Sequence, residues 1–243
     1  MPRSQRPDYG IDAPGVVRNL ALAGVVLIAI AIWGPAKLRI GPVDVLIHAM
    51  FYWIGSVCLA EAILMLLYAK HGKFLHRDAM ISGLQWRGDE RVLDIGTGRG
   101  LLLIAAAKHL NSGRAMGVDI WKASDLSRNA RQRTEANLDL EGVRGKCDLL
   151  EEDARKMSFA DGSFDVVLSN LCLHNIAGKG GRDQACREIS RVLKRGGVAL
   201  ISDFKNTAEY AAIFRAEGLT VQRSGPDIFN TFPPLRIVKA RKL

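Results

Sequence analysis

Residues 91–100, RVLDIGTGRG, contain the residue types with the clearest chemical potential in the chain. An apolar run leads to Asp94 and then to glycines at three alternate positions, Gly96, Gly98 and Gly100. Glycine permits a sharp backbone bend and lets a ligand lie against the main chain, where a Cβ atom would block it. A helix-like apolar pattern follows directly, so the expected order is strand, turn, helix. This order predicts a nucleotide or nucleoside site at one edge of an α/β sheet.

The spacing of the glycines narrows the choice of ligand. The dinucleotide pattern G-x-G-x-x-G has its third glycine where this chain has Leu101. The sequence contains no G-x-x-x-x-G-K-[ST], so it has no phosphate loop for ATP or GTP hydrolysis. Residues 114–120 read as a second strand, and Asp119 near its end is placed to bind both ribose hydroxyls of an adenosine. The pattern therefore favours an adenosine-containing ligand that no phosphate loop holds.

With these motifs the chain resembles the class I S-adenosylmethionine (SAM) dependent methyltransferases, whose first motif is an acidic residue followed by G-x-G-x-G. Three further stretches follow in the order of that family, DLLEEDARKM at 148–157, FDVVLSNLCLHNI at 164–176 and RVLKRGGVALISDF at 191–204. The resemblance covers residues 83–243 and is closest to the type 11 and ubiquinone or menaquinone methyltransferases. It implies a Rossmann-like, mostly parallel sheet with an antiparallel last strand and helices on both faces. It also implies SAM as the cofactor, which carries no phosphate.

The resemblance assigns roles at the cofactor site residue by residue. Asp94 would bind the methionine ammonium group, Asp119 the ribose and Asp153 the adenine amino group. Ordinary capping of strand-to-helix turns is the alternative role for the first two carboxylates. The expected cofactor-binding residues are Asp94, Gly96, Thr97, Gly98, Gly100, Asp119, Ile120, Trp121, Asp153, Ala154, Ser169 and Asn170.

His174 is the candidate catalytic base. It lies in the loop that faces the transferred methyl group in the family, and imidazole titrates near neutral pH. A histidine that only hydrogen-bonds this loop or packs beneath the next helix is an equal alternative. Cys172 is expected to be a small buried residue rather than a nucleophile. Residues 224–234, which include Phe229, could wall an apolar substrate or simply connect the last two strands.

The elements that must position these residues can be read along the same part of the chain. Helices are expected over residues 124–137, 180–194 and 206–217, and the last two strands begin at Leu219 and Leu235. These two strands would form the antiparallel end of the sheet.

The composition argues against disulfides, a metal site and a nucleic-acid partner. The four cysteines form no C-x-x-C pair and the five histidines no H-E-x-x-H motif, so reduced thiols and no metal are expected. The formal net charge is +9 at pH 7, but the basic residues are scattered without interleaved aromatic residues. The SNLC sequence at 169–172 also departs from the motifs of nucleic-acid methyltransferases. Nucleic acid is therefore not an expected partner, and attraction to an acidic membrane surface explains the charge.

The first seventy residues differ in kind from the rest. Residues 19–36 carry no charge and residues 45–69 only that of Glu61, so both segments are long enough to span a bilayer. We expect a helical hairpin over residues 19–69 that anchors the protein in a membrane. A polar, mobile tail at 1–18 would precede it, and a basic linker at 70–82, able to meet anionic headgroups, would lead to the catalytic domain at 83–243.

Other interpretations of the apolar segments stay open. They include a signal peptide, a soluble helical cap over the active site, and one span with an interfacial second helix. Glu61 could face Cys58 or a substrate channel, or pair with His48 or a neighbouring chain. Basic residues outside both ends of the hairpin favour a cytoplasmic catalytic domain.

The expected function is that of a membrane-associated SAM-dependent methyltransferase acting on a lipophilic or amphipathic small molecule. Quinone precursors, lipids and small thiols are the candidate acceptors. A SAM-binding membrane scaffold without turnover is the alternative, and a nucleic-acid methyltransferase is a weaker one. The sequence gives no prediction of the oligomeric state.

Overall fold

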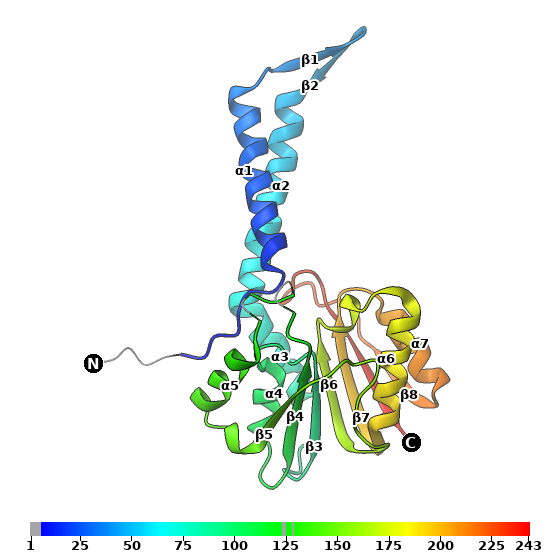
Figure 1. The fold of residues 1–243 in the computed structure, drawn as a ribbon. Coiled ribbons are helices and arrows are strands. Elements are labelled where there is room, and N and C mark those ends of the chain that lie inside the picture. The colour runs from blue at the N-terminus through cyan, green and yellow to red at the C-terminus, as the bar shows by residue number, and fades with distance from the viewer. Residues whose placement is uncertain (1–5, 123–124, 128) are drawn as a thin grey trace, which may run out of the picture.

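The computed structural model describes residues 6–122, 125–127 and 129–243, with the backbone alone at positions 38, 40, 43 and 44. Its two parts are an α/β domain and a long helical hairpin that stands away from the domain (Figure 1). The glycine turn and the expected site residues lie at the edge of the domain nearest the hairpin.

A seven-stranded sheet forms the centre of the domain, in the order β5-β4-β3-β6-β7-β9-β8. The first five strands in this order are parallel to one another, and β9 is antiparallel to both of its neighbours. This arrangement confirms the predicted fold. The strands are β3 (Arg91–Ile95), β4 (Arg114–Asp119), β5 (Cys147–Glu151), β6 (Phe164–Asn170), β7 (Leu193–Asp203), β8 (Leu219–Arg223) and β9 (Arg236–Lys242).

Helices cover both faces of the sheet, because successive strand residues point to opposite sides. Leu93 and Ile95 of β3 pack with α6 and α7 on one face, and Val92 packs with α3, α4 and α5 on the other. The helices are α3 (Lys73–Ser82), α4 (Leu101–Ala107), α5 (Arg131–Leu140), α6 (Gly178–Val192) and α7 (Thr207–Ala216), with short 3₁₀ turns at Arg144–Lys146 and Leu173–Asn175.

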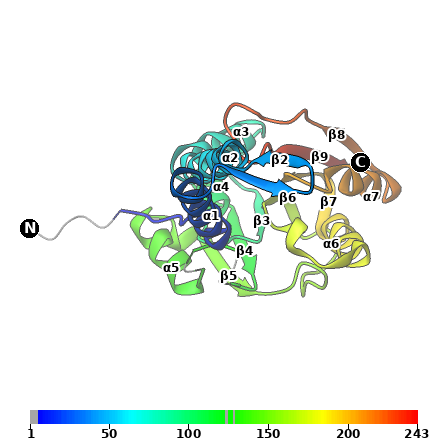
Figure 2. The ribbon, with the colours of Figure 1, turned by 90° about the horizontal axis from the view of Figure 1, so that it is seen from above.

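The hairpin consists of two antiparallel helices that pack on each other through small residues. It comprises α1 (Pro14–Trp33), β1 (Lys37–Ile40), β2 (Val43–Leu46) and α2 (Ile47–Leu67). A Cβ atom added at Gly24 would lie 2.9 Å from the carbonyl oxygen of Gly55, and one added at Gly55 would lie 3.0 Å from that of Gly24. Seen from above, the hairpin lies over the α3 and α4 side of the domain (Figure 2).

The structure moves the predicted boundaries of the hairpin. The first helix begins at Pro14 instead of residue 19, and the second at Ile47 instead of 45. A two-stranded ribbon of β1 and β2 joins the two helices. The Nε2 atom of His48 lies 2.8 Å from the carbonyl oxygen of Gly34, so a pairing with Glu61 is not found among the described residues.

The predicted basic linker at 70–82 is wrong, because this segment is helical and packed. A π turn at Tyr68–Gly72 continues α2 directly into α3, which packs against α4. Lys73 and His76 are each 3% exposed, so neither can meet lipid headgroups, whereas Lys70 is exposed. The hairpin and the domain are therefore joined by a continuous helical backbone.

The predicted mobile tail at 1–18 is also wrong where it can be tested. Its first five residues lie outside the described part of the chain, but residues 8–13, here called the strap, cross the glycine turn. The backbone N–H of Asp8 donates to Asn137 Oδ1 at 2.9 Å. Asp12 forms an antiparallel bridge with Leu126, and the N–H of Ser127 donates to the carbonyl of Ile11 at 3.0 Å. These bonds fix the strap to the domain.

The helix predicted over residues 124–137 begins later, at Arg131, and ends at Leu140. Positions 124 and 128 lie outside the described residues, and Leu126 and Ser127 pair with the strap instead of forming a helical turn. The two later predicted helices match α6 and α7 to within two residues.

Candidate active site at the glycine turn

The glycine turn between β3 and α4 has a backbone that other residues rarely adopt. The φ angles of Gly96, Gly98 and Gly100 are 72°, 53° and 84°, in the left-handed region that favours glycine. A Cβ atom at Gly96 would lie 2.3 Å from the Sγ atom of Cys172. Cys172 is thus a packing residue, as expected, and burial raises the pKa of its thiol.

Asp94 is buried at the end of β3, directly before the turn. Its Oδ2 accepts hydrogen bonds from the Thr97 hydroxyl at 2.8 Å and from the backbone N–H of Leu103 at 3.0 Å. Burial raises the pKa of the carboxyl group to about 7, although both hydrogen bonds oppose the change. Asp94 therefore caps the start of α4 and also titrates near neutral pH.

Asp119 ends the neighbouring strand β4 and bonds to the same turn. Its carboxylate accepts from the N–H of Gly98 at 2.7 Å and from the N–H of Trp121 at 2.6 Å, and burial raises its pKa. The Trp121 indole N–H donates to the carbonyl of Gly98 at 3.2 Å, so this ring supports the turn. Ile120 is 56% exposed and remains available to contact a ligand ring.

The next two strand ends complete the expected cofactor set. Asp153, after β5, binds the guanidinium of Arg155, which lowers the pKa of its carboxyl group, and Ala154 beside it is buried. Ser169 at the end of β6 is fully buried and donates to the carbonyl of Ile95 at 3.0 Å. Ser169, Thr97 and Trp121 thus support the turn.

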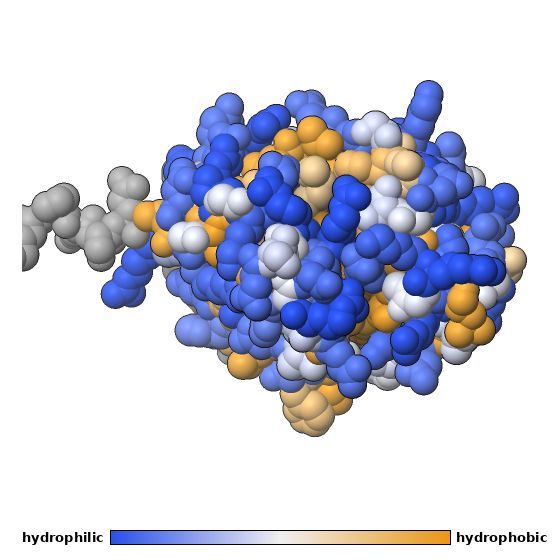
Figure 3. Space-filling model, turned by 90° about the horizontal axis from the view of Figure 1, so that it is seen from below, coloured by the Kyte–Doolittle hydropathy of each residue, from blue (hydrophilic) through white to orange (hydrophobic). Residues whose placement is uncertain are grey.

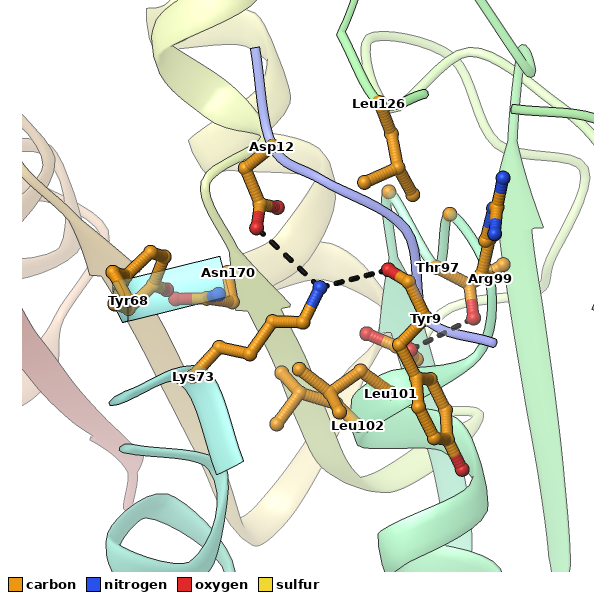
Figure 4. A pocket seen from close by; sticks show the side chains of 13 residues that line it. Tyr9, Asp12, Tyr68, Lys73, Thr97, Arg99, Leu101, Leu102, Leu126 and Asn170 are labelled. Carbon is orange, nitrogen blue, oxygen red and sulfur yellow. Dashed lines mark hydrogen bonds and ion pairs between the residues drawn. The ribbon is translucent and has the colours of Figure 1, made fainter. Parts of the chain in front are cut away.

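A cavity of about 60 Å³ lies between the turn, the strap and the base of the hairpin (Figure 4). Four buried polar atoms on its wall lack a hydrogen-bond partner among the described residues: Asp12 Oδ2, Tyr68 OH, Arg99 Nε and Asn170 Oδ1. Such atoms are unfavourable unless a ligand or water binds them. The full lining is Tyr9, Asp12, Tyr68, Lys73, Asp94, Gly96, Thr97, Gly98, Arg99, Leu101, Leu102, Leu126 and Asn170.

Two buried cations hold the strap over this cavity. The ammonium group of Lys73 donates to the carbonyls of Tyr9 at 2.8 Å and Gly10 at 2.6 Å, and lies 3.5 Å from Asp12 Oδ2 (Figure 4). Arg99 is 2% exposed and pairs with the Asp8 carboxylate at 2.6 Å. The site is therefore assembled from three separate parts of the chain.

His174, the predicted base, lies outside the cavity that the structure describes. Its Nδ1 is 2.8 Å from Asp203 Oδ1, and its backbone N–H donates to Asp203 Oδ2 at 3.0 Å. Its ring packs edge-on against Phe204, with 4.7 Å between the centroids. These contacts agree with both alternatives, because a carboxylate at Nδ1 can hold the loop and can also orient a histidine base.

Most residues of the cavity wall outside the glycine motif are not predicted from the sequence. Asp12, Tyr68 and Lys73 belong to segments that the sequence predicts to be tail, anchor and linker. Phe74 and Ile81, seven positions apart and so on one helical face, are the apolar signal for a packed helix here. No metal-binding group of three or more His, Cys, Asp or Glu residues occurs in the part of the chain that the structure describes.

Comparison with known proteins agrees with this geometry. Residues 93–201 match the family model described as a methyltransferase domain. This match spans the sheet from β3 to most of β7. The matched family and the structural neighbours imply SAM as the cofactor.

Two curated relatives illustrate the range of the methyltransferases it resembles. A ribosomal protein L11 methyltransferase from Syntrophotalea carbinolica is 36% identical over 145 residues, covering 58% of this chain and 40% of the relative. A ubiquinone/menaquinone biosynthesis C-methyltransferase UbiE from Hydrogenovibrio crunogenus is 34% identical over 119 residues, covering 49% and 43%. The chain spans less than half the length of these two relatives.

Solved structures share the fold at low sequence identity. The YcgJ protein from Bacillus subtilis has a TM-score of 0.55 at 19% identity, covering 69% of this chain and 98% of its own. An O-methyltransferase family protein from Burkholderia thailandensis has a TM-score of 0.58 at 15% identity, covering 93% and 70%.

The residues at the turn fit SAM. Two carboxylates stand at the ends of adjacent parallel strands, and their predicted partners are an ammonium group for Asp94 and ribose hydroxyls for Asp119. A Cβ atom at Gly96 would lie 2.3 Å from Cys172 and one at Gly98 3.1 Å from Leu126, so the glycines let these side chains pack against the turn. The donors and acceptors at the site match a cationic nucleoside without phosphate.

Proposed function

We propose that the protein is a membrane-anchored, SAM-dependent methyltransferase that modifies a lipophilic or amphipathic small molecule. One observation supports this most directly: the cavity at the glycine turn is walled on one side by Tyr68, at the base of the apolar hairpin. The cofactor site and the proposed membrane anchor therefore share a boundary.

The residues of the domain would bind the cofactor and align it. SAM supplies a methyl group on a cationic sulfur. Asp119 would bind the ribose hydroxyls, Asp94 the ammonium group, and Ile120 one face of the adenine. Methyl transfer is an in-line displacement, so the chain contributes by alignment and by excluding water from the cavity.

The exposed surface of the hairpin supports a location in the bilayer. Its helices contain 20 and 21 residues, and at about 1.5 Å per residue each is about 30 Å long, the thickness of the hydrocarbon core. Their most apolar windows have mean hydropathies of 2.2 and 1.9, yet only 17% and 11% of those windows is buried. Large apolar side chains such as Leu22, Val26 and Ile63 face outward. A soluble cap would instead cover these side chains with the domain, from which the hairpin stands away (Figure 1).

The loop at residues 224–234 supports a second contact with the membrane. Ile228 and Phe229 are 62% and 92% exposed, so Phe229 does not wall a substrate cavity in this structure. The loop lies against the hairpin base, because a Cβ atom at Gly72 would be 2.1 Å from the Asn230 carbonyl oxygen. The face of the domain opposite the hairpin is mostly hydrophilic (Figure 3).

Charged residues near the hairpin and the names of the relatives support an orientation of the domain relative to the membrane and a class of acceptor. Arg18 and Lys70 lie at the domain end of the hairpin, which favours a cytoplasmic domain. Several relatives are named ubiquinone/menaquinone C-methyltransferases, so a quinone precursor is the leading acceptor, with lipids and small thiols as further candidates.

Mass spectrometry tests the proposal. Purified full chain in detergent is incubated with methyl-labelled SAM and an organic extract of membranes. We expect label in a lipid-soluble product, and none with the Asp119→Ala variant. Uptake of SAM by calorimetry with every extract unlabelled would favour the scaffold alternative, and no uptake by the folded chain would overturn the assignment.

A further inference from the structure

The cavity wall holds polar atoms for which no contact with a particular group of the cofactor is assigned, including that of Asn170, which is expected in the cofactor site. They come from the strap (Asp12), the hairpin base (Tyr68) and the end of β6 (Asn170). Tyr68 is 5% exposed, and its hydroxyl lies beside the Asn170 amide without forming a hydrogen bond of good geometry within the described part of the chain. Figure 4 shows the Tyr68 and Asn170 side chains close together, with Asp12 on the neighbouring wall beside Lys73. A buried, unsatisfied hydroxyl at this point indicates a ligand group.

The types of these atoms indicate which group fits. The Asp12 carboxylate oxygen and the Asn170 amide oxygen can only accept a hydrogen bond, whereas the Tyr68 hydroxyl can also donate one. A ligand hydroxyl satisfies both kinds of partner, because it donates its hydrogen and accepts at its oxygen. The rest of the wall includes Leu101 and Leu102, which suit an apolar body carrying that hydroxyl.

We propose that Asp12, Tyr68 and Asn170 form the acceptor site, that the acceptor carries an acidic hydroxyl of the phenol or enol class, and that Asp12 accepts its proton. This inference rests on the proposed methyltransferase function. The O–H bond breaks, the proton bonds to an Asp12 carboxylate oxygen, and the electron pair stays on the acceptor oxygen. That pair, conjugated with the ring, makes the acceptor a stronger nucleophile, and the proton leaves to solvent after turnover.

The surroundings of Asp12 suit this role. The Asp12 side chain is 30% exposed, but its Oδ2 atom is buried, and this desolvation raises the pKa of the carboxyl group although Lys73 opposes the change. A raised pKa makes the carboxylate a stronger base. Lys73 is the charged side chain that faces Asp12, at 3.5 Å. A phenol is about as acidic as a tyrosine side chain, with a pKa of about 10, whereas an aliphatic alcohol is too weak an acid for a carboxylate to deprotonate.

Binding of two matched probes tests the site without turnover. The full chain in detergent, saturated with S-adenosylhomocysteine, is titrated with 4-octylphenol and with its methyl ether, 4-octylanisole, at equal micellar concentrations. We expect the phenol to bind about tenfold more tightly, because only the phenol can donate to Asp12 or Asn170. Asn170→Ala should reduce this preference. Tyr68→Phe should weaken the binding of both probes, since the Tyr68 hydroxyl can donate a hydrogen bond to the oxygen of either one. The control Tyr52→Phe, on an exposed tyrosine of α2, should change neither affinity.

Turnover distinguishes a proton acceptor from a structural residue. Asp12→Asn keeps an oxygen that can accept a hydrogen bond but cannot take the proton. It should therefore lower kcat for label transfer into the membrane extract by about 100-fold or more, while KM and the affinity for S-adenosylhomocysteine stay within about threefold. Asp78→Asn, on an exposed carboxylate of α3, is the matched control and should leave all three unchanged.

The outcomes separate this inference from the function on which it rests. Failure of the folded chain to bind S-adenosylhomocysteine would contradict the methyltransferase assignment. Normal binding of that nucleoside with equal affinities for phenol and ether, or with full turnover by Asp12→Asn, would overturn the acceptor site alone. If Asp12→Asn lost nucleoside affinity in step with kcat, Asp12 would only hold the strap and the proton-acceptor role would be wrong.

Discussion

The hairpin and the domain use apolar residues in opposite ways. In the domain the large side chains are inside, and Tyr210, Phe164 and Phe214 are fully buried against the sheet. In the hairpin the small residues are inside, and the larger ones, such as Trp53 at 71% exposed, point outward. Water favours the first arrangement, whereas lipid tails accept exposed apolar side chains and leave close backbone packing to hold helices together. The contrast supports the proposal that the hairpin lies in lipid and the domain in water.

The largest effect is expected in the domain, at Gly96. Gly96→Val places a branched side chain at φ 72° and against Cys172, so we expect a loss of about 3–5 kcal/mol in the free energy of unfolding and no SAM binding. Denaturant unfolding of the full chain in detergent measures it. Gly145→Val, at a glycine with open space around it, is the control. Equal stability of the two variants would contradict the close packing described at the turn.

A second change tests the hairpin in the same way. Gly24→Ile would push the added side chain into Leu59 and the Gly55 carbonyl and separate the helices, at a cost of about 1–3 kcal/mol to the hairpin. The affinity of the domain for S-adenosylhomocysteine should not change, because Gly24 lies in the middle of α1 and the cavity lies at the base of the hairpin. Thermal unfolding in detergent, with Gly15→Ile as the control at an open position, separates the two regions. Loss of nucleoside binding by Gly24→Ile would show that they are coupled.

Asp94 should make cofactor binding depend on pH. With a pKa of about 7, the buried carboxyl group is protonated at pH 6 and ionised at pH 8, and only the ionised form attracts the ammonium group of the ligand. Affinity for S-adenosylhomocysteine should therefore rise about tenfold from pH 6 to pH 8 by calorimetry. Because the folded pKa lies above the unfolded one, the free energy of unfolding without ligand should fall as pH rises from about 4 to 7. Asp94→Asn should abolish both trends, and their persistence in that variant would assign them to another group.

The smallest effect is expected where the two regions meet at the membrane surface. Replacing Ile228 and Phe229 with serine should lower label transfer to a bilayer-borne acceptor a few-fold, since it removes apolar area from the proposed contact. Transfer to the same acceptor in dilute detergent should not change. An equal loss in both assays would show that the loop acts on the catalytic site instead of on the membrane.

The sheet and the glycine turn could be predicted because their signals are local. Alternating glycines after Asp94 and an acid at the end of the next strand need only neighbouring residues to be recognised. The strap could not, since its bonds join residues 8–12 to Arg99, Ser127 and Asn137, far away along the chain. A short polar segment has no periodicity that would indicate such partners.

His174 shows a second limit. Its residue type and its loop predict a base, and that role stays a prediction, but the sequence does not indicate its partner Asp203, which lies on a different strand. Residue type reports what a side chain can do, and the surrounding fold decides which group it faces. The same reasoning explains why Lys73 was assigned to a membrane-facing linker when it is buried beneath the strap.

The π turn at Tyr68–Gly72 makes the proposed anchor and the catalytic domain one continuous rod of helix. If the hairpin spans a bilayer, this continuous helix would fix the distance between the reactive centre and the membrane surface. An acceptor would then be chosen by depth as well as by shape, and only a molecule whose reactive group rises to that level would be modified.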